Sequence, residues 1–135
     1  MRIGILLFST ILCLTAFTQH KAHISGTVEN SFDGKIEIRV NDRFLAEPEV
    51  KKYPVESGEF EFTVILDQAG FVSFTYREQT LDLFLKPGDN LKMKFNEAEV
   101  VKSVSFSGTA AIENQFLLGF MNKFSQHFDR EALLD

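Results

Sequence analysis

The residues of this chain that could carry chemistry are few, and they lie far apart in the sequence. Its three histidines are His20, His23 and His127, and none has a cysteine, histidine or carboxylate partner at the spacing of a metal site. Glutamates recur in pairs two residues apart, and such a pair shares one face of a strand, where it could act as general acid and base. No further catalytic group accompanies the pairs, so they fit a solvated strand face better. The pairs are Glu47 with Glu49, Glu59 with Glu61, and Glu97 with Glu99.

The sequence also lacks the motifs of the common nucleophilic and nucleotide-dependent enzymes. It has no Gly-x-Ser-x-Gly, no phosphate-binding loop and no dinucleotide fingerprint. We therefore expect no catalytic, cofactor-binding or metal-binding residues, no cofactor, and no enzymatic activity of this chain. The net charge of −5, from 14 basic and 19 acidic residues, argues against nucleic acids and anionic membrane surfaces, because both need a basic face.

The first residues have the pattern of a signal peptide. Arg2 precedes an apolar run over 3–17 that is too short to span a bilayer comfortably. We expect cleavage after residues 1–18, which leaves Gln19 at the mature N-terminus and a periplasmic or secreted protein; an uncleaved membrane anchor is the alternative. Cys13, the single cysteine of the chain, would leave with this segment. The mature chain would then have no thiol and no disulfide.

After the signal segment the pattern is that of short strands separated by turns. Apolar and polar residues alternate in segments such as "KIEIRV" and "FEFTVIL", as they do in half-buried strands. The signal is weaker over 41–57, since Pro48 and Pro54 cannot donate to a strand ladder. The spacing predicts a mainly β domain over 19–108, an antiparallel β-sandwich or partly open barrel of about seven or eight strands.

The stretch "LFLKPGDNLKMKF", residues 83–95, has the clearest turn signal. Pro87 presets the φ of turn position i+1 and Gly88 accepts a positive φ at i+2, which predicts a type II turn. We expect a hairpin whose two strands put their alternate apolar side chains into the core. Those side chains are Leu83 and Leu85 before the turn, and Leu91, Met93 and Phe95 after it.

The hydrophobic period changes after Gly108, from two residues to about four. Thr109 is a fair N-cap, and the pattern over 109–135 predicts one C-terminal amphipathic helix with an aromatic stripe. This helix could pack on the sandwich or lead to a missing domain and dock it. We favour packing on the sandwich, so Phe116→Asp should unfold the domain. The stripe consists of Ile112, Phe116, Phe120, Phe124 and Phe128.

Four segments follow the signal segment in a recognisable order: "ISGTV", "SGEFEF", "PGDNL" and "FSGTAAIENQFL". Together they resemble the N-terminal, DUF4369-type domain of periplasmic thiol-disulfide oxidoreductases of Bacteroidetes, which are TlpA/ResA-like members of the thioredoxin family. The resemblance covers residues 21–128. In that family a thioredoxin-fold domain with a Cys-x-x-Cys motif follows and carries the redox chemistry. This chain has no such motif, so no catalytic residue is carried over.

The resemblance implies a non-catalytic accessory or interaction domain of a periplasmic thioredoxin-like redox protein, here as a fragment or a stand-alone form. Its partner would be a thioredoxin-fold domain or another envelope protein. The alternative is an independent envelope module that binds a sugar, a peptide or a protein. A cluster of exposed aromatic side chains in one concave patch would favour this alternative. The candidates for such an interaction surface are Phe44, Tyr53, Phe71 and Phe84.

Overall fold

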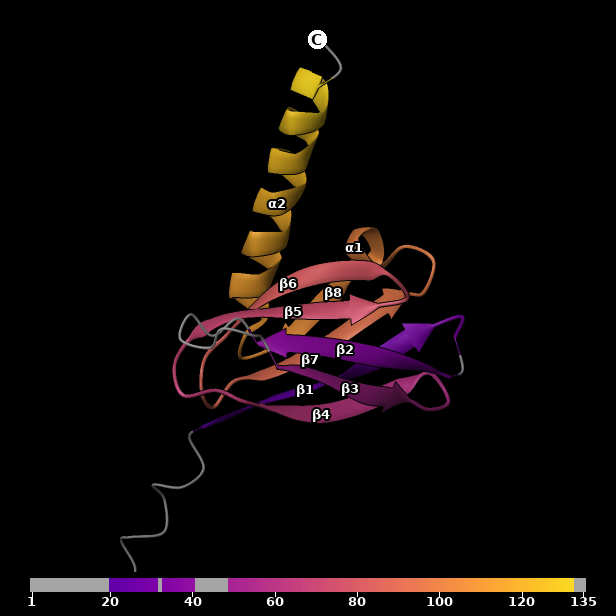
Figure 1. Cartoon of the computed structure of the whole chain (residues 1–135), viewed down its shortest axis with the longest axis vertical. Coiled ribbons are helices and arrows are strands. Elements are labelled where there is room, and N and C mark those ends of the chain that lie inside the picture. The colour runs from indigo at the N-terminus through magenta and orange to yellow at the C-terminus, as the bar shows by residue number, and fades with distance from the viewer. Residues whose placement is uncertain (1–19, 32, 41–48, 133–135) are drawn as a thin grey trace, which may run out of the picture.

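The computed structural model describes residues 20–31, 33–40 and 49–132, and it confirms the predicted mainly β sandwich with a C-terminal helix. In these ranges eight strands form two facing four-stranded sheets, and helix α2 rises from one side of the sandwich (Figure 1). The expected signal segment with Cys13 lies outside the described residues, as does Phe44. The elements are β1 (Lys21–Glu29), β2 (Gly34–Val40), β3 (Val50–Val55), β4 (Glu59–Ile65), β5 (Gly70–Tyr76), β6 (Gln79–Leu85), β7 (Asn90–Asn96), α1 (Val100–Ser103), β8 (Ser105–Gly108) and α2 (Ala111–Ala132).

The two sheets have simple strand orders. Sheet A has the order β4-β1-β7-β8, and sheet B has the order β3-β2-β5-β6. Neighbouring strands are antiparallel with one exception, the parallel pair of β1 and β7. This pair departs from the purely antiparallel sandwich that we expected. Alternating polarity shows which residues of a strand face the core, but it does not show the direction of the neighbouring strand.

The turn at Pro87 and Gly88 forms as predicted, but it does not close a hairpin. Gly88 has a φ of 89°, and the amide of Asp89 donates to the carbonyl of Lys86 at 3.0 Å. However, β6 belongs to sheet B and β7 to sheet A, so the turn carries the chain across the sandwich. The apolar sides of β6 and β7 therefore face each other from opposite sheets. The predicted hairpin is therefore wrong. The sequence could not exclude it, because β6 and β7 bury the same alternate residues whether they pair in one sheet or face each other from two sheets.

The inner faces of the two sheets fill the core with the alternate apolar residues. Phe60, Phe74 and Phe95 pack against one another, with ring centroids 5.9, 6.0 and 5.7 Å apart. Gly26 of β1 permits this packing, because a Cβ at this position would collide with the Phe60 ring and with the carbonyl oxygen of Met93. The glycine of the "ISGTV" segment is therefore required by close approach in the core.

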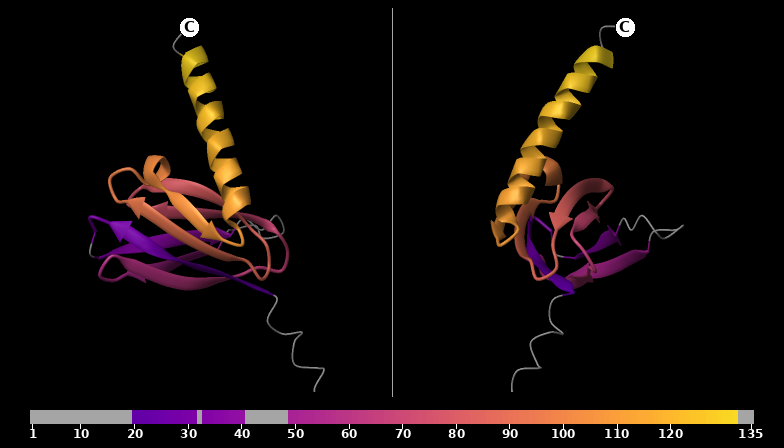
Figure 2. Two further views of the ribbon diagram at one scale, coloured as in Figure 1. Left: turned by 180° about the vertical axis from the view of Figure 1, so that it is seen from behind. Right: turned by 90° about the vertical axis from the view of Figure 1, so that its left-hand side faces the viewer.

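The described side chains of the aromatic stripe do not pack on the sandwich, contrary to our expectation, and the side chain of Phe128 lies outside the described residues. Figures 1 and 2 show the helix standing away from the strands, with its first turns against β6 and β8. The inner faces of the two sheets pack on each other and close the core, so the stripe has no place in it. Phe116 is not a core residue, and the expected unfolding by Phe116→Asp loses its basis. The exposed fractions are 80% for Ile112, 77% for Phe116, 55% for Phe120 and 49% for Phe124.

Candidate functional site

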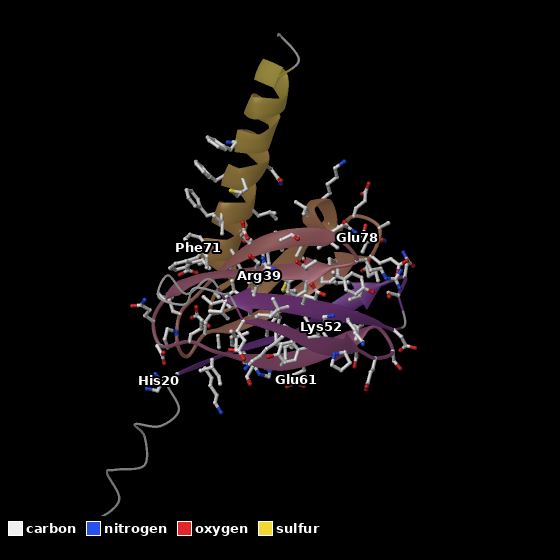
Figure 3. The ribbon with its side chains drawn as sticks, in the orientation of Figure 1. His20, Arg39, Lys52, Glu61, Phe71 and Glu78 are labelled. Atoms are coloured by element: carbon white, nitrogen blue, oxygen red, sulfur yellow. The ribbon has the colours of Figure 1, made fainter. Side chains whose placement is uncertain are left out.

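The base of α2 and the outer face of sheet B meet in an apolar corner. Phe71 on β5 and Phe84 on β6 lie directly across from each other, and their rings pack edge to face with centroids 5.4 Å apart. Figure 3 shows Phe71 beside the base of the helix. The two rings and the first turns of α2 enclose a groove of about 420 Å³. This apolar corner is lined by Phe71, Phe84, Ile112, Glu113, Phe116 and Leu117.

The exposed apolar surface continues from the corner along the helix. Phe120 and Phe124 stack with ring centroids 5.8 Å apart and an interplanar angle of 15°. Met121 lies beside them and is 44% exposed. A contiguous exposed apolar surface of this kind is typical of an interaction site. We call the exposed residues of this face the α2 stripe: Ile112, Phe116, Phe120, Met121 and Phe124.

Asn114, in the first turns of α2, fixes the helix to the sandwich. It is 1% exposed. Its Oδ1 accepts a hydrogen bond from the amide of Phe84 at 2.8 Å, and its Nδ2 donates to the carbonyl of Phe84 at 2.9 Å. Nδ2 also donates to the carbonyl of Ala110 at 2.8 Å. The side chain thus pairs with the edge of β6 as a neighbouring strand would.

The amide side chain of Gln79 forms a second link between β6 and a helical segment, at the other end of the strand. Nε2 of Gln79 donates to the carbonyl of Glu97 at 2.8 Å, and its Oε1 accepts from the amide of Val100 at 2.8 Å. Gln79 thereby ties the start of β6 to the segment that enters α1. Two amide side chains therefore join this edge of sheet B to helical segments that follow strands of sheet A.

Glu113 adds an ion pair at the rim of the apolar corner. Its Oε1 lies 3.3 Å from Nζ of Lys86, in the turn that follows β6. A backbone hydrogen bond at Glu113 and the hydrogen bond from Lys86 hold the pKa of the carboxyl below its ordinary value, against a smaller opposing effect of desolvation. A carboxylate in the first turn is also favoured by the helix dipole. The pair helps to hold the base of α2 in place.

The structure brings together two of the four aromatic residues that we expected on an interaction surface. Phe71 and Phe84 form the apolar corner, whereas Tyr53 lies elsewhere, stacked on Phe62 with ring centroids 4.2 Å apart. The hydroxyl of Tyr53 donates to the carbonyl of Thr63 at 3.4 Å, so this side chain closes the edge between β3 and β4. Phe44 lies outside the described residues. The aromatic helix was recognised in the sequence, but its exposure and the buried role of Asn114 were not.

Among the described residues, no group of three or more histidines, cysteines and acidic residues could hold a metal ion. His23 pairs with Glu61 at 2.9 Å, and no third ligand completes a metal site among the described residues. Within the same residues, no helix combines the length and the apolar character needed to cross a bilayer.

Comparisons with known proteins give no family. No family model matches the chain, and no curated protein matches it. Among solved structures it is similar to a proposed cell adhesion protein from Bacteroides ovatus, with 10% identity and a TM-score of 0.37. The similarity covers 68% of this chain and 44% of that protein, so the chain spans less than half of its length. A likeness this low indicates neither a shared fold nor a shared function.

Proposed function

We propose that the chain is a non-catalytic interaction domain of a periplasmic thioredoxin-like redox protein, and that the apolar corner and the α2 stripe hold its partner. The observation that carries this proposal is the exposure of the stripe on a helix whose base is firmly anchored. Full burial of one large apolar side chain contributes about 1.5–3 kcal/mol. A partner that covered the stripe would therefore gain several such contributions.

The shape of this surface suits a folded domain better than a small ligand. Ile112 and Phe124 are separated by twelve helical steps, which corresponds to about 18 Å along the helix axis. Ile112, Phe116, Phe120, Met121 and Phe124 all present apolar side chains, and the ion pair of Glu113 with Lys86 lies at the rim, so the partner surface that covers the stripe should be apolar as well. The partner that we propose is a thioredoxin-fold domain, because such a domain follows the corresponding helix in the family that the sequence resembles.

Site-specific photo-cross-linking in the cell envelope tests the proposal. A photoreactive phenylalanine analogue at Phe120 should cross-link to a thioredoxin-fold domain that contains a Cys-x-x-Cys peptide, identified by mass spectrometry. The same analogue at Lys35, an exposed position on β2, is the matched control and should not give this product. If the redox domain belongs to the same polypeptide, the cross-link is intramolecular and the intact protein is larger and has a reducible pair of thiols.

Two results would overturn the proposal. One is a cross-link from position 120 only to a second copy of this chain or only to lipid. The other is the same set of products from positions 120 and 35, since this would mean that the stripe selects no partner.

A further inference from the structure

The outer face of sheet A contains a polar groove that the proposed docking surface does not use. Its volume is about 640 Å³, and it runs along β1 (the face is turned to the viewer in the left panel of Figure 2). Small hydroxyl side chains on β1 form the floor, and long charged side chains on β4 and β7 form the walls. We call this the β1 groove, and Glu56, Ser105 and Ser107 line its margins. Its floor and its two walls are formed by Ser25, Thr27, Glu59, Glu61, Lys92 and Lys94.

Strand register places these residues in two parallel rows. Ser25 lies between Glu61 of β4 and Lys92 of β7. In the second row, Thr27 lies between Glu59 and Lys94. Because neighbouring strands are about 4.8 Å apart, the backbones of the two walls are about 10 Å apart. One wall is therefore acidic along its length, the opposite wall is basic, and the short floor residues leave the space between them open.

Two of the four wall charges are already paired, and two are not. Glu61 pairs with His23 at 2.9 Å, and Lys94 pairs with Glu29 at 3.1 Å. The side chains of Glu59 and Lys92 form no ion pair with any described residue, and both are exposed. They stand diagonally across the groove, about 10 Å apart across the strands and about 7 Å along them. Glu56, just before β4, also lines the groove and forms no ion pair with a described residue, so the groove offers two free carboxylates and one free ammonium to the same ligand.

We propose that the β1 groove binds a short peptide with free termini, with the peptide ammonium at Glu59 and the peptide carboxylate at Lys92. Two or three extended residues span about 7–10 Å, which matches the distance between the two charged groups once both side chains lean into the groove. The hydroxyls of Ser25 and Thr27 can hydrogen-bond the peptide groups that lie over the floor. A neutral sugar fits less well, because the phenylalanines beneath the groove, Phe60 and Phe106, are buried and offer no ring to stack on.

Backbone NMR of the purified protein, titrated with L-trialanine, tests this site. We expect saturable shifts of the amides of Ser25, Thr27 and Lys92, with weakening of the binding as salt is added, because the wall charges are exposed and screened. The double variant Glu59→Gln with Lys92→Met should weaken the binding at least tenfold. The matched control, Asp67→Asn with Lys35→Met, makes the same charge changes at exposed residues outside the groove and should bind like the wild type.

The blocked peptide and a neutral sugar complete the design. Trialanine with an acetylated amino group and an amidated carboxyl group should not shift the groove amides, because it carries neither terminal charge. Equal binding of the blocked peptide would overturn the proposal, as would shifts confined to another face or equal affinities of the two double variants. Binding of maltose without binding of trialanine would also overturn it. The thermal melts of both variants should match the wild type, since all four substituted side chains are exposed.

Discussion

Replacing Asn114 by alanine tests how α2 is held on the sandwich. The substitution removes three hydrogen bonds, two to Phe84 and one to the carbonyl of Ala110. A net contribution of about 1 kcal/mol for each bond gives a loss of about 3 kcal/mol. The better helix propensity of alanine returns about 0.6 kcal/mol, so the expected destabilisation is about 2 kcal/mol. For a domain of this size that corresponds to a fall in melting temperature of roughly 8 °C.

Thermal unfolding and amide hydrogen exchange together test whether Asn114 anchors the helix. The amide of Phe84 should exchange much faster in Asn114→Ala than in the wild type, because it loses its acceptor. Gln115→Ala is the matched control, since Gln115 is the next helical residue and is exposed. It should change stability by less than about 0.5 kcal/mol. A melt of Asn114→Ala equal to that of this control, with Phe84 still protected, would refute the anchoring role.

Four further substitutions test the packing and the charge of Glu113. Phe116→Asp should change the free energy of unfolding by less than about 0.5 kcal/mol in thermal melts, because the side chain is 77% exposed. An unfolded variant would mean that Phe116 is a core residue after all. Gly26→Ala should destabilise the protein by about 3 kcal/mol or more, since a Cβ has no room there. Gly119→Ala, at an open position of the helix, should stabilise it by up to about 1 kcal/mol. Denaturant titrations in which both variants changed the free energy of unfolding in the same direction would contradict this. The lowered pKa of Glu113 means that its carboxylate stabilises the fold above the ordinary carboxyl range, and that this contribution is lost as the pH falls through the folded-state pKa. The melting temperature of Glu113→Gln should therefore lie below that of the wild type at neutral pH and approach it at acid pH. A difference in melting temperature that grew on acidification would contradict this prediction.

The strands and the helix could be predicted because their signals are local. Alternation in "KIEIRV" and "FEFTVIL" depends only on which side of a strand faces the core, and β2 and β4 occupy these segments. The change of period after Gly108 likewise marks α2, which spans Ala111–Ala132. The glycine after Pro87 was assigned correctly for the same reason, since a positive φ is a property of one residue.

The pairing of the strands and the exposure of the helix could not be predicted, because both depend on distant parts of the chain. The apolar alternation of β6 and β7 is the same whether they pair in one sheet or face each other from two sheets. The aromatic stripe is the same whether the sandwich, a partner or water covers it. Asn114 looks like a surface residue by type, and only its place opposite the edge of β6 makes it a buried anchor.

The central place of β1 in sheet A has a consequence for the order of folding. Ile24 of β1 pairs with Phe62 of β4 on one side and with Leu91 of β7 on the other, so both neighbours come from much later in the chain. Sheet B, in contrast, contains the local hairpin of β5 and β6. Contacts between distant segments form slowly, because a long loop must close before they are made. A chain that emerges from the ribosome or a translocation channel with its N-terminus first would therefore hold β1 without β4 until Ile65 has followed, and without β7 until Asn96 has followed. Sheet A would be completed after the local hairpin of sheet B.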